Sequence, residues 1–179
     1  MSRMHPVPLD EASYFGRDEI IVSKTDKQGC IVYANDVFCR MAELSTSETI
    51  GEAHNLIRHP DMPRVIFQLL WDTISAGDEI FAYIKNIAKS GKYYWVFAHV
   101  TPSFDAAGNI IGYHSNRRSP NPQALASIAG LYKKLLDEEK AHTSPKQGLE
   151  ASAKMLMEML EAKNTSYSEF VWGLENGDV

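Results

Sequence analysis

The sequence predicts an α+β fold: a five-stranded antiparallel sheet with short helices on one face, followed by a helical appendage at the carboxyl end. Two β-branched runs joined by a polar turn come first, helical segments fill the middle, and three longer strand-like segments follow. Beyond residue 120 the apolar spacing is helical throughout. We therefore divide the chain into a lead-in or cap over residues 1–18, a main domain over 19–119 and carboxyl-terminal helices over 120–179.

The first elements of the main domain are predicted to be a hairpin and short helices. Apolar runs at 20–22 and 30–33 flank the turn 26–29, which ends in glycine. Apolar residues recur at helical spacing over 35–44, and Ser45 with Glu48 then matches a capping box. A hairpin followed by two short helices is expected.

The main helix of the domain is predicted to begin near Asp61 and to end at Gly77. Asp61 can cap its first turn, and Pro63 falls in that turn, where its missing N–H costs nothing. Three strands are then predicted over 79–88, 93–104 and 109–118. Short turns between them favour an antiparallel meander. The apolar stripe of the helix consists of Ile66, Leu69, Leu70 and Ile74.

Composition restricts the function classes. Eighteen Lys and Arg against 23 Asp and Glu give a net charge of −5, and no basic stripe predicts nucleic acid binding. The chain has two cysteines, Cys30 and Cys39, and no apolar leader, which indicates a reducing, cytoplasmic compartment. No apolar run approaches the roughly 18 residues of a membrane span, so any action at the inner membrane should be peripheral, through a receptor. Hydrolase, P-loop and zinc motifs are missing, and an enzyme is not expected.

The segment 54–63, His-Asn-Leu-Ile-Arg-His-Pro-Asp-Met-Pro, is long and unusual. With Trp71, Lys85-Asn86, Tyr94-Trp95 and Thr101-Pro102, it resembles the flavin-binding PAS sensor family over roughly residues 19–135. The likeness is to the PAS domain of bacterial aerotaxis receptors and, more closely, to the free-standing PAS proteins of bipartite energy-taxis systems. The resemblance implies a PAS fold in which FAD, held non-covalently between helices and sheet, signals through its redox state.

The same resemblance implies a partner. A chain of this type is expected to contact a separate membrane chemoreceptor, a methyl-accepting transducer protein, with the helices from Gln147 onward as candidate docking elements. A homodimer through the amino-terminal segment or a strand face stays open. Neither cysteine follows His54 in the helical segment where blue-light PAS relatives carry their adduct-forming thiol, so covalent photochemistry is not expected.

The candidate cofactor-binding residues are Asn35, His54, Arg58, His59, Asp61, Trp71 and Asn86. The resemblance associates Arg58, His59 and Asp61 with flavin binding. The residues themselves indicate an anion site, because a helix start favours negative charge and an arginine fork can hold a pyrophosphate. A plain helix cap at Asp61 and a structural salt bridge at Arg58 are the alternatives.

Asn86 is a polar amide on a strand face that otherwise carries Ile80, Ala82, Ile84 and Ala88. A buried amide needs partners, and we interpret Asn86 as facing the polar edge of the flavin rather than as a satisfied sheet amide. Flavin N5 changes from acceptor to donor on reduction. Asn86 is therefore expected to reorient with redox state.

The aromatic residues also leave alternatives open. Trp71 lies four residues after Phe67, so the two can stack as ordinary core or Trp71 can face the cofactor. Trp95 alternates with Tyr93 and Phe97 on one strand face. For that row we favour a surface covered by a tail helix or a partner, over plain core or a flavin wall.

Three alternative hypotheses for the site stay open. A haem-based gas sensor would use a histidine as axial ligand. An interaction module would have an empty pocket. A metal site would gather His54, His59, His99, His114 and Asp61.

Overall fold

The structure is a computed structural model that describes residues 6–178. The sheet elements are β1 (Ile21–Thr25), β2 (Ile31–Ala34), β3 (Ile80–Ile87), β4 (Tyr93–Phe104) and β5 (Ile110–Arg118). The helices are α1 (Asp36–Ala42), α2 (Thr46–Thr49), the 3₁₀ helix η1 (His54–Ile57), α3 (Arg64–Ser75), α4 (Pro122–Ala141), α5 (Pro145–Ala162) and α6 (Tyr167–Asn176).

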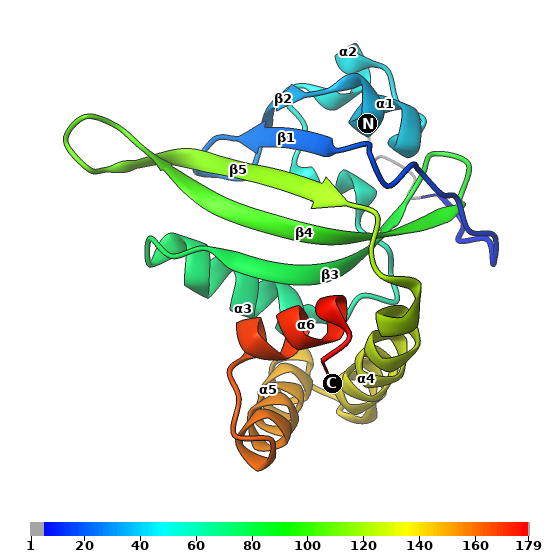
Figure 1. Cartoon of the computed structure of the whole chain (residues 1–179), viewed down its shortest axis with the longest axis vertical. Helices are drawn as coiled ribbons and strands as arrows, with labels where there is room; N and C mark the ends of the chain where they lie inside the picture. Colours follow the sequence, from blue (N-terminus) through cyan, green and yellow to red (C-terminus); the bar gives the residue numbers. More distant parts are fainter. Residues whose placement is uncertain (1–5, 179) are drawn as a thin grey trace.

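The five strands form one antiparallel sheet in the order β2-β1-β5-β4-β3, as predicted (Figure 1). The pairing aligns Ala98 of β4 with Arg117 of β5, and Asn86 of β3 with Tyr94 of β4. Since side chains alternate between faces, Asn86 and Arg117 both lie on the inner face, which the short helices cover.

The start of α3 differs from the prediction. Pro63 is the N-cap rather than a first-turn residue, and no side chain of the adjoining segment caps the helix, so a cap by Asp61 is wrong. The carboxylate of Glu139 on α4 takes that place, accepting from the backbone N–H of Arg64 and of Val65 at 3.0 Å each. Asp61 is engaged elsewhere, with the ammonium group of Lys85 at 2.9 Å.

The other caps agree with the sequence. Asn35 caps α1, and Ser45 with Glu48 forms the expected capping box of α2. Gly77 follows α3 with φ 97°, a conformation in which a Cβ atom would be strained.

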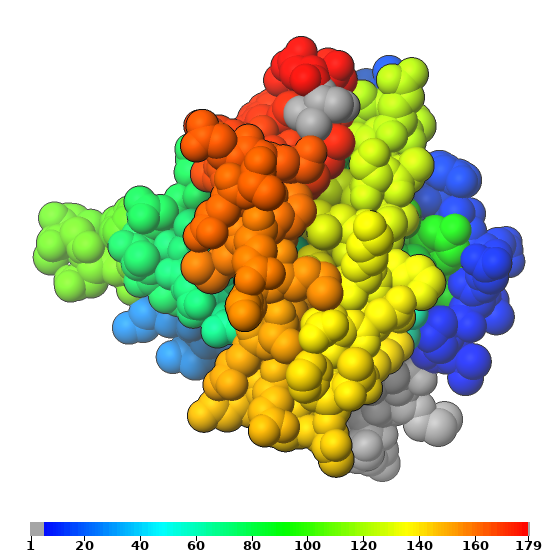
Figure 2. Space-filling view, turned by 90° about the horizontal axis from the view of Figure 1, so that it is seen from below, coloured from blue at the N-terminus to red at the C-terminus, as the bar shows by residue number. Residues whose placement is uncertain are grey.

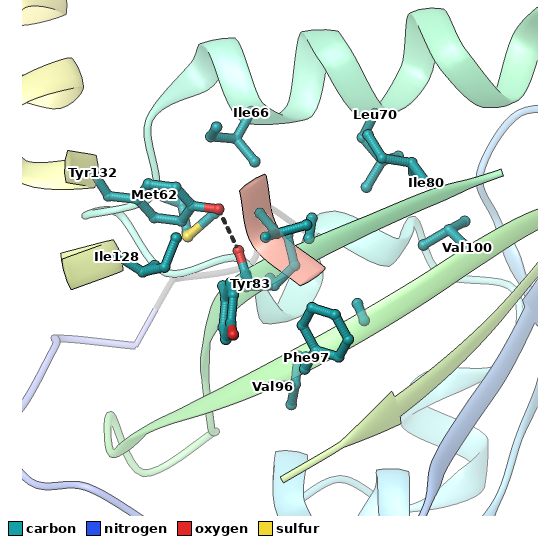
Figure 3. Packing of buried hydrophobic residues seen from close by; sticks show 14 of the residues in the cluster. Met62, Ile66, Leu70, Ile80, Tyr83, Val96, Phe97, Val100, Ile128 and Tyr132 are labelled. Atoms are coloured by element: carbon teal, nitrogen blue, oxygen red, sulfur yellow. Dashed lines mark hydrogen bonds between the residues drawn. The ribbon is translucent and has the colours of Figure 1, made fainter. Parts of the chain in front are cut away.

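The tail helices lie beyond the β3 edge of the sheet, and α4 and α5 run side by side (Figures 1 and 2). The hydroxyl of Tyr132 on α4 donates to the backbone carbonyl of Tyr83 on β3 at 2.8 Å (Figure 3). It also bonds the hydroxyl of Tyr167 on α6 at 2.9 Å. A carbonyl of the edge strand, which would otherwise face solvent, is thereby satisfied by the tail.

The tail helices pack against two of the three residues of the outer aromatic row, Trp95 and Phe97, as favoured from the sequence. The ring of Trp95 lies 6.0 Å from that of Tyr132, and the ring of Phe97 lies 5.5 Å from that of Trp172 on α6. Phe81 joins the cluster, 4.8 Å from Trp172. The tail helices therefore cover this part of the sheet partly: Phe97 is buried, whereas Trp95 and Phe81 are half-buried.

The amino-terminal segment follows the start of β4. The N–H of Ser13 donates to the carbonyl of Tyr93, and the N–H of Tyr93 donates to that of Glu11. Phe15 is buried in the main core. Residues 1–5 of the predicted lead-in lie outside the described residues.

No helix in the part of the chain that the structure describes combines the length and apolar character required to cross a membrane.

Candidate functional site

A cavity of about 410 Å³ lies between the inner face of the sheet and the segment from η1 to α3. Small-molecule sites in proteins usually measure roughly 300–1,000 Å³, so this cavity is large enough for a flat ring system. Its walls are mostly apolar, formed by Ile57, Leu70, Ile74, Ile84 and Val100.

The charged part of the described lining consists of Arg58, Arg64 and Arg117, with no carboxylate. The chain as a whole carries a net charge of −5, so the positive charge of these three arginines is opposite in sign to the overall charge. A cavity with only cationic charge on its wall favours a ligand that brings negative charge.

Arg58 and Arg64 lie near the start of α3. The guanidinium of Arg58 lies 4.1 Å from the centre of the Phe67 ring and donates to the carbonyl of Met62 at 3.4 Å. Arg64 donates to the carbonyl of Pro145 at 3.0 Å. Burial lowers the pKa of Arg58, but the group stays a cation at neutral pH. Stacking on Phe67 holds the fork of Arg58 in place.

Arg117 lies deep in the cavity, on the sheet, with 4% of its surface exposed. Its Nη2 donates to the hydroxyl of Ser23 at 2.8 Å and lies 2.6 Å from Nε2 of His54. An arginine can only donate, so Nε2 of His54 accepts and carries no proton. Burial, and then the charge of Arg117, lower the pKa of His54 to about 3, which keeps the ring neutral at physiological pH.

Within residues 6–178, three polar groups of residues that line the cavity have no hydrogen-bond partner: Nδ2 of Asn86, the hydroxyl of Ser115 and Nη1 of Arg117. Each belongs to a buried residue on the inner face of the sheet. Buried polar groups are nearly always paired, because an unpaired one costs about 1–3 kcal/mol. Together these groups suit a ligand whose edge offers several hydrogen-bond acceptors.

The comparisons with known proteins identify the fold. Residues 31–117 match the family described as PAS fold. This part of the chain has the PAS fold.

Two curated relatives extend the likeness. The chain is 35% identical over 131 residues to the aerotaxis receptor of Escherichia coli (strain K12), which covers 73% of this chain and 26% of the receptor. It is 28% identical over 99 residues to the nitrogen fixation regulatory protein of Klebsiella pneumoniae, covering 55% of this chain and 20% of that protein. The chain thus corresponds to a minor part of each of these longer proteins.

Among solved structures, the chain resembles the light-state structure of the blue-light photoreceptor Aureochrome1 LOV. The TM-score is 0.53 at 22% identity, and the match covers 68% of this chain and 91% of that one. At this identity the likeness concerns the fold alone.

The PAS cavity brings together four of the seven predicted residues: His54, Arg58, Trp71 and Asn86 line it. Trp71 lies beside the turn at Gly29, its ring edge-on to Tyr113 at 5.4 Å, with 38% of the residue exposed. Asn86 pairs through its backbone with Arg58, so these two candidates are fixed next to each other.

The other three predicted residues lie outside the cavity lining. Asn35 holds the chain locally, accepting from the N–H of Val22 and of Phe38 at 3.0 Å each. The ring of His59 is buried and accepts from the N–H of Asp61 at 3.1 Å, and Asp61 pairs with Lys85. These contacts hold the loop that carries Arg58 against β3. A role of these three residues in binding a cofactor stays a prediction.

The sequence reasoning missed Arg117, Ser23 and Ser115. Two of them could have been recognised from the alternation of side chains along β5, which places Tyr113, Ser115 and Arg117 on one face of the sheet. Two arginines are adjacent at 117 and 118, so only the register with β4 decides which one points inward.

The rival ligands fit this PAS cavity less well. Nε2 of His54, the histidine in the described lining, is already engaged by Arg117 and Ser23, which leaves it unsuited to be an axial ligand. No group of three metal-ligating side chains occurs within residues 6–178. His99, one of the residues considered for a metal, pairs with Glu79 at 2.7 Å on the outer side of the sheet. The described lining also contains no cysteine.

Proposed function

We propose that this chain is a cytoplasmic redox or energy sensor that holds FAD non-covalently in its PAS cavity. The observation that carries the proposal is the cavity itself: its described lining has arginines and no carboxylate, and three polar groups on the sheet are unpaired within the described residues. A flavin ring offers acceptors along one edge and apolar surface elsewhere, which matches such a lining. Its similarity to the aerotaxis receptor supports the same reading.

Bound FAD would supply reversible redox chemistry, while the residues of the chain bind and orient it. Asn86 and Arg117 would contact the ring edge, and Arg58 would pair with the phosphates. Phe67 fixes the guanidinium of Arg58 in advance, so little side-chain freedom is lost on binding. We assign the chain a signalling role without turnover.

Output should pass by contact with a separate membrane chemoreceptor of the methyl-accepting type. Because α4 and α6 contact β3 directly, and α5 contributes Leu149 to the cavity wall, a change in the cavity can reach the tail helices by direct contact. The expected reorientation of Asn86 would cost or gain roughly 1–3 kcal/mol. That is enough to shift a two-state equilibrium about tenfold or more.

The test is the absorbance of the purified chain before and after addition of FAD, followed by anaerobic dithionite. We expect flavin bands that bleach on reduction. Arg58→Ala should weaken FAD about tenfold or more and leave riboflavin, which lacks phosphate, nearly unchanged. Arg40→Ala, which removes an exposed arginine paired with Glu19, is the matched control. A chain that takes up no flavin, or that shows an intense haem band instead, would refute the proposal.

A further inference from the structure

Arg117 differs from the other arginines of the cavity in having no anionic or carbonyl partner among the described residues. Arg58 and Arg64 each donate to a backbone carbonyl. Arg117 is bonded through Nη2 to a hydroxyl and a neutral imidazole, while its Nη1 has no partner. None of the ion pairs in the described part of the chain involves Arg117. The guanidinium is thus a buried positive charge for which residues 6–178 supply no counterion.

A purely structural arginine would not be expected in this state. A buried cation is normally paired, since removing its hydration is costly. Burial lowers the pKa of Arg117 only to about 10, so the group is still charged at neutral pH. The ring of Phe38, 5.6 Å from the guanidinium carbon, offers only a weak cation–π contact. The guanidinium therefore keeps an unused donor, Nη1, on a residue that lines the cavity.

The surroundings of Arg117 indicate which part of a ligand it meets. Its cross-strand neighbour Ala98 is small and lines the cavity. Val100 and Ile84 line it as well, so the sheet presents an apolar floor to the cavity beside Arg117. Such a floor accepts a flat ring and disfavours a hydrated phosphate. The edge of a ring, rather than a phosphate, would then be the part of a ligand nearest to Arg117.

We propose that Arg117 binds the electron-rich edge of the cofactor ring and favours its reduced, negatively charged form. This inference rests on the proposed function, because it takes the ligand to be a flavin. Two electrons and one proton convert the neutral ring into one with a single negative charge, the electrons coming from an external reductant. A fixed positive charge stabilises that product more than the neutral oxidised ring.

The experiment is a spectroelectrochemical titration of the FAD-loaded chain and of Arg117→Met. Loss of the charge should weaken binding of the reduced form relative to the oxidised form by about tenfold or more. For a two-electron couple this tenfold change lowers the midpoint potential by about 30 mV. Arg117→Lys, which keeps the charge, should lie close to wild type. Arg118→Met removes the adjacent, exposed arginine on the opposite face and should leave the potential unchanged.

A second measurement separates this role from a structural one. Urea unfolding without cofactor should give Arg117→Met a midpoint no lower than that of wild type, because a costly unpaired charge is removed. If the redox potentials of wild type and Arg117→Met are equal and the urea midpoint of the variant is lower, Arg117 has a structural role. That result would overturn the inference without contradicting FAD binding. Failure of wild type to bind FAD would instead refute both this inference and the proposed function.

Discussion

Replacing Glu139 with glutamine should loosen the joint between the tail helices and the helix that borders the cavity. In the native chain Oε2 accepts from the N–H of Arg64 and Oε1 from that of Val65, and the hydroxyl of Ser152 donates to Oε1 at 3.3 Å. Glutamine keeps one acceptor and presents an NH₂ group to the other N–H. One bond at the helix start is therefore lost, together with a negative charge that favours a helix amino terminus.

The expected cost follows from these two losses. Removing a helix cap costs about 0.5–2 kcal/mol, and removing a charge near the terminus costs about 0.3–1 kcal/mol. Glu139 is partly exposed, which reduces the second amount. We therefore expect Glu139→Gln to lower the free energy of unfolding by about 1–2 kcal/mol.

Urea unfolding followed by circular dichroism measures this change, which should lower the midpoint at constant slope. Amide exchange at Arg64 and Val65 should also become faster. Glu138→Gln is the matched control, since Glu138 pairs only with His142 on the helix surface and should cost less than about 0.5 kcal/mol. Equal midpoints and equal exchange in the two variants would refute the reasoning.

Two further outcomes are expected. Gly29→Ala should lower the free energy of unfolding by about 1–2 kcal/mol, because Gly29 has φ 83°. The added Cβ would lie 3.1 Å from the Trp71 ring and should alter tryptophan fluorescence. An unchanged emission spectrum would contradict the placement of Trp71. Burial, and then Arg117, lower the pKa of folded His54 to about 3, whereas the unfolded chain takes up that proton near pH 6.5. The free energy of unfolding should therefore fall as pH drops from about 6.5 toward 3, by up to roughly 1.4 kcal/mol per pH unit. In His54→Gln this fall should be smaller. Urea midpoints measured at pH 7 and pH 5 for both proteins check the difference.

The fold was largely predictable because its signals are local. Turn residues at 26–29, the Ser45 capping box and the strand runs place the elements close to where the structure has them. The start of α3 was not predictable in the same way. The side chain that caps it belongs to Glu139, 75 residues from Arg64, and no local sequence pattern predicts a capping carboxylate from another helix.

The candidate site was predicted in part for the same reason. Asn86 could be recognised as a polar residue on an apolar strand face, and the structure places it on the cavity. His59 and Asp61 share a sequence segment with Arg58, but their side chains turn toward Lys85 and the loop backbone. Proximity in sequence did not distinguish a residue that faces the cavity from one that holds the loop.

Besides α3, whose start is capped by Glu139 of α4, β3 is an element through which a change in the cavity would reach the tail. Its inner face places Asn86 on the cavity, its outer face places Phe81 against Trp172, and its edge carbonyl accepts from Tyr132. Packed interiors shift between discrete arrangements, so a displacement of β3 must also move its contacts with α4 and α6. The partner contact of the proposed sensor should accordingly involve α4–α6 rather than β2 at the opposite edge of the sheet.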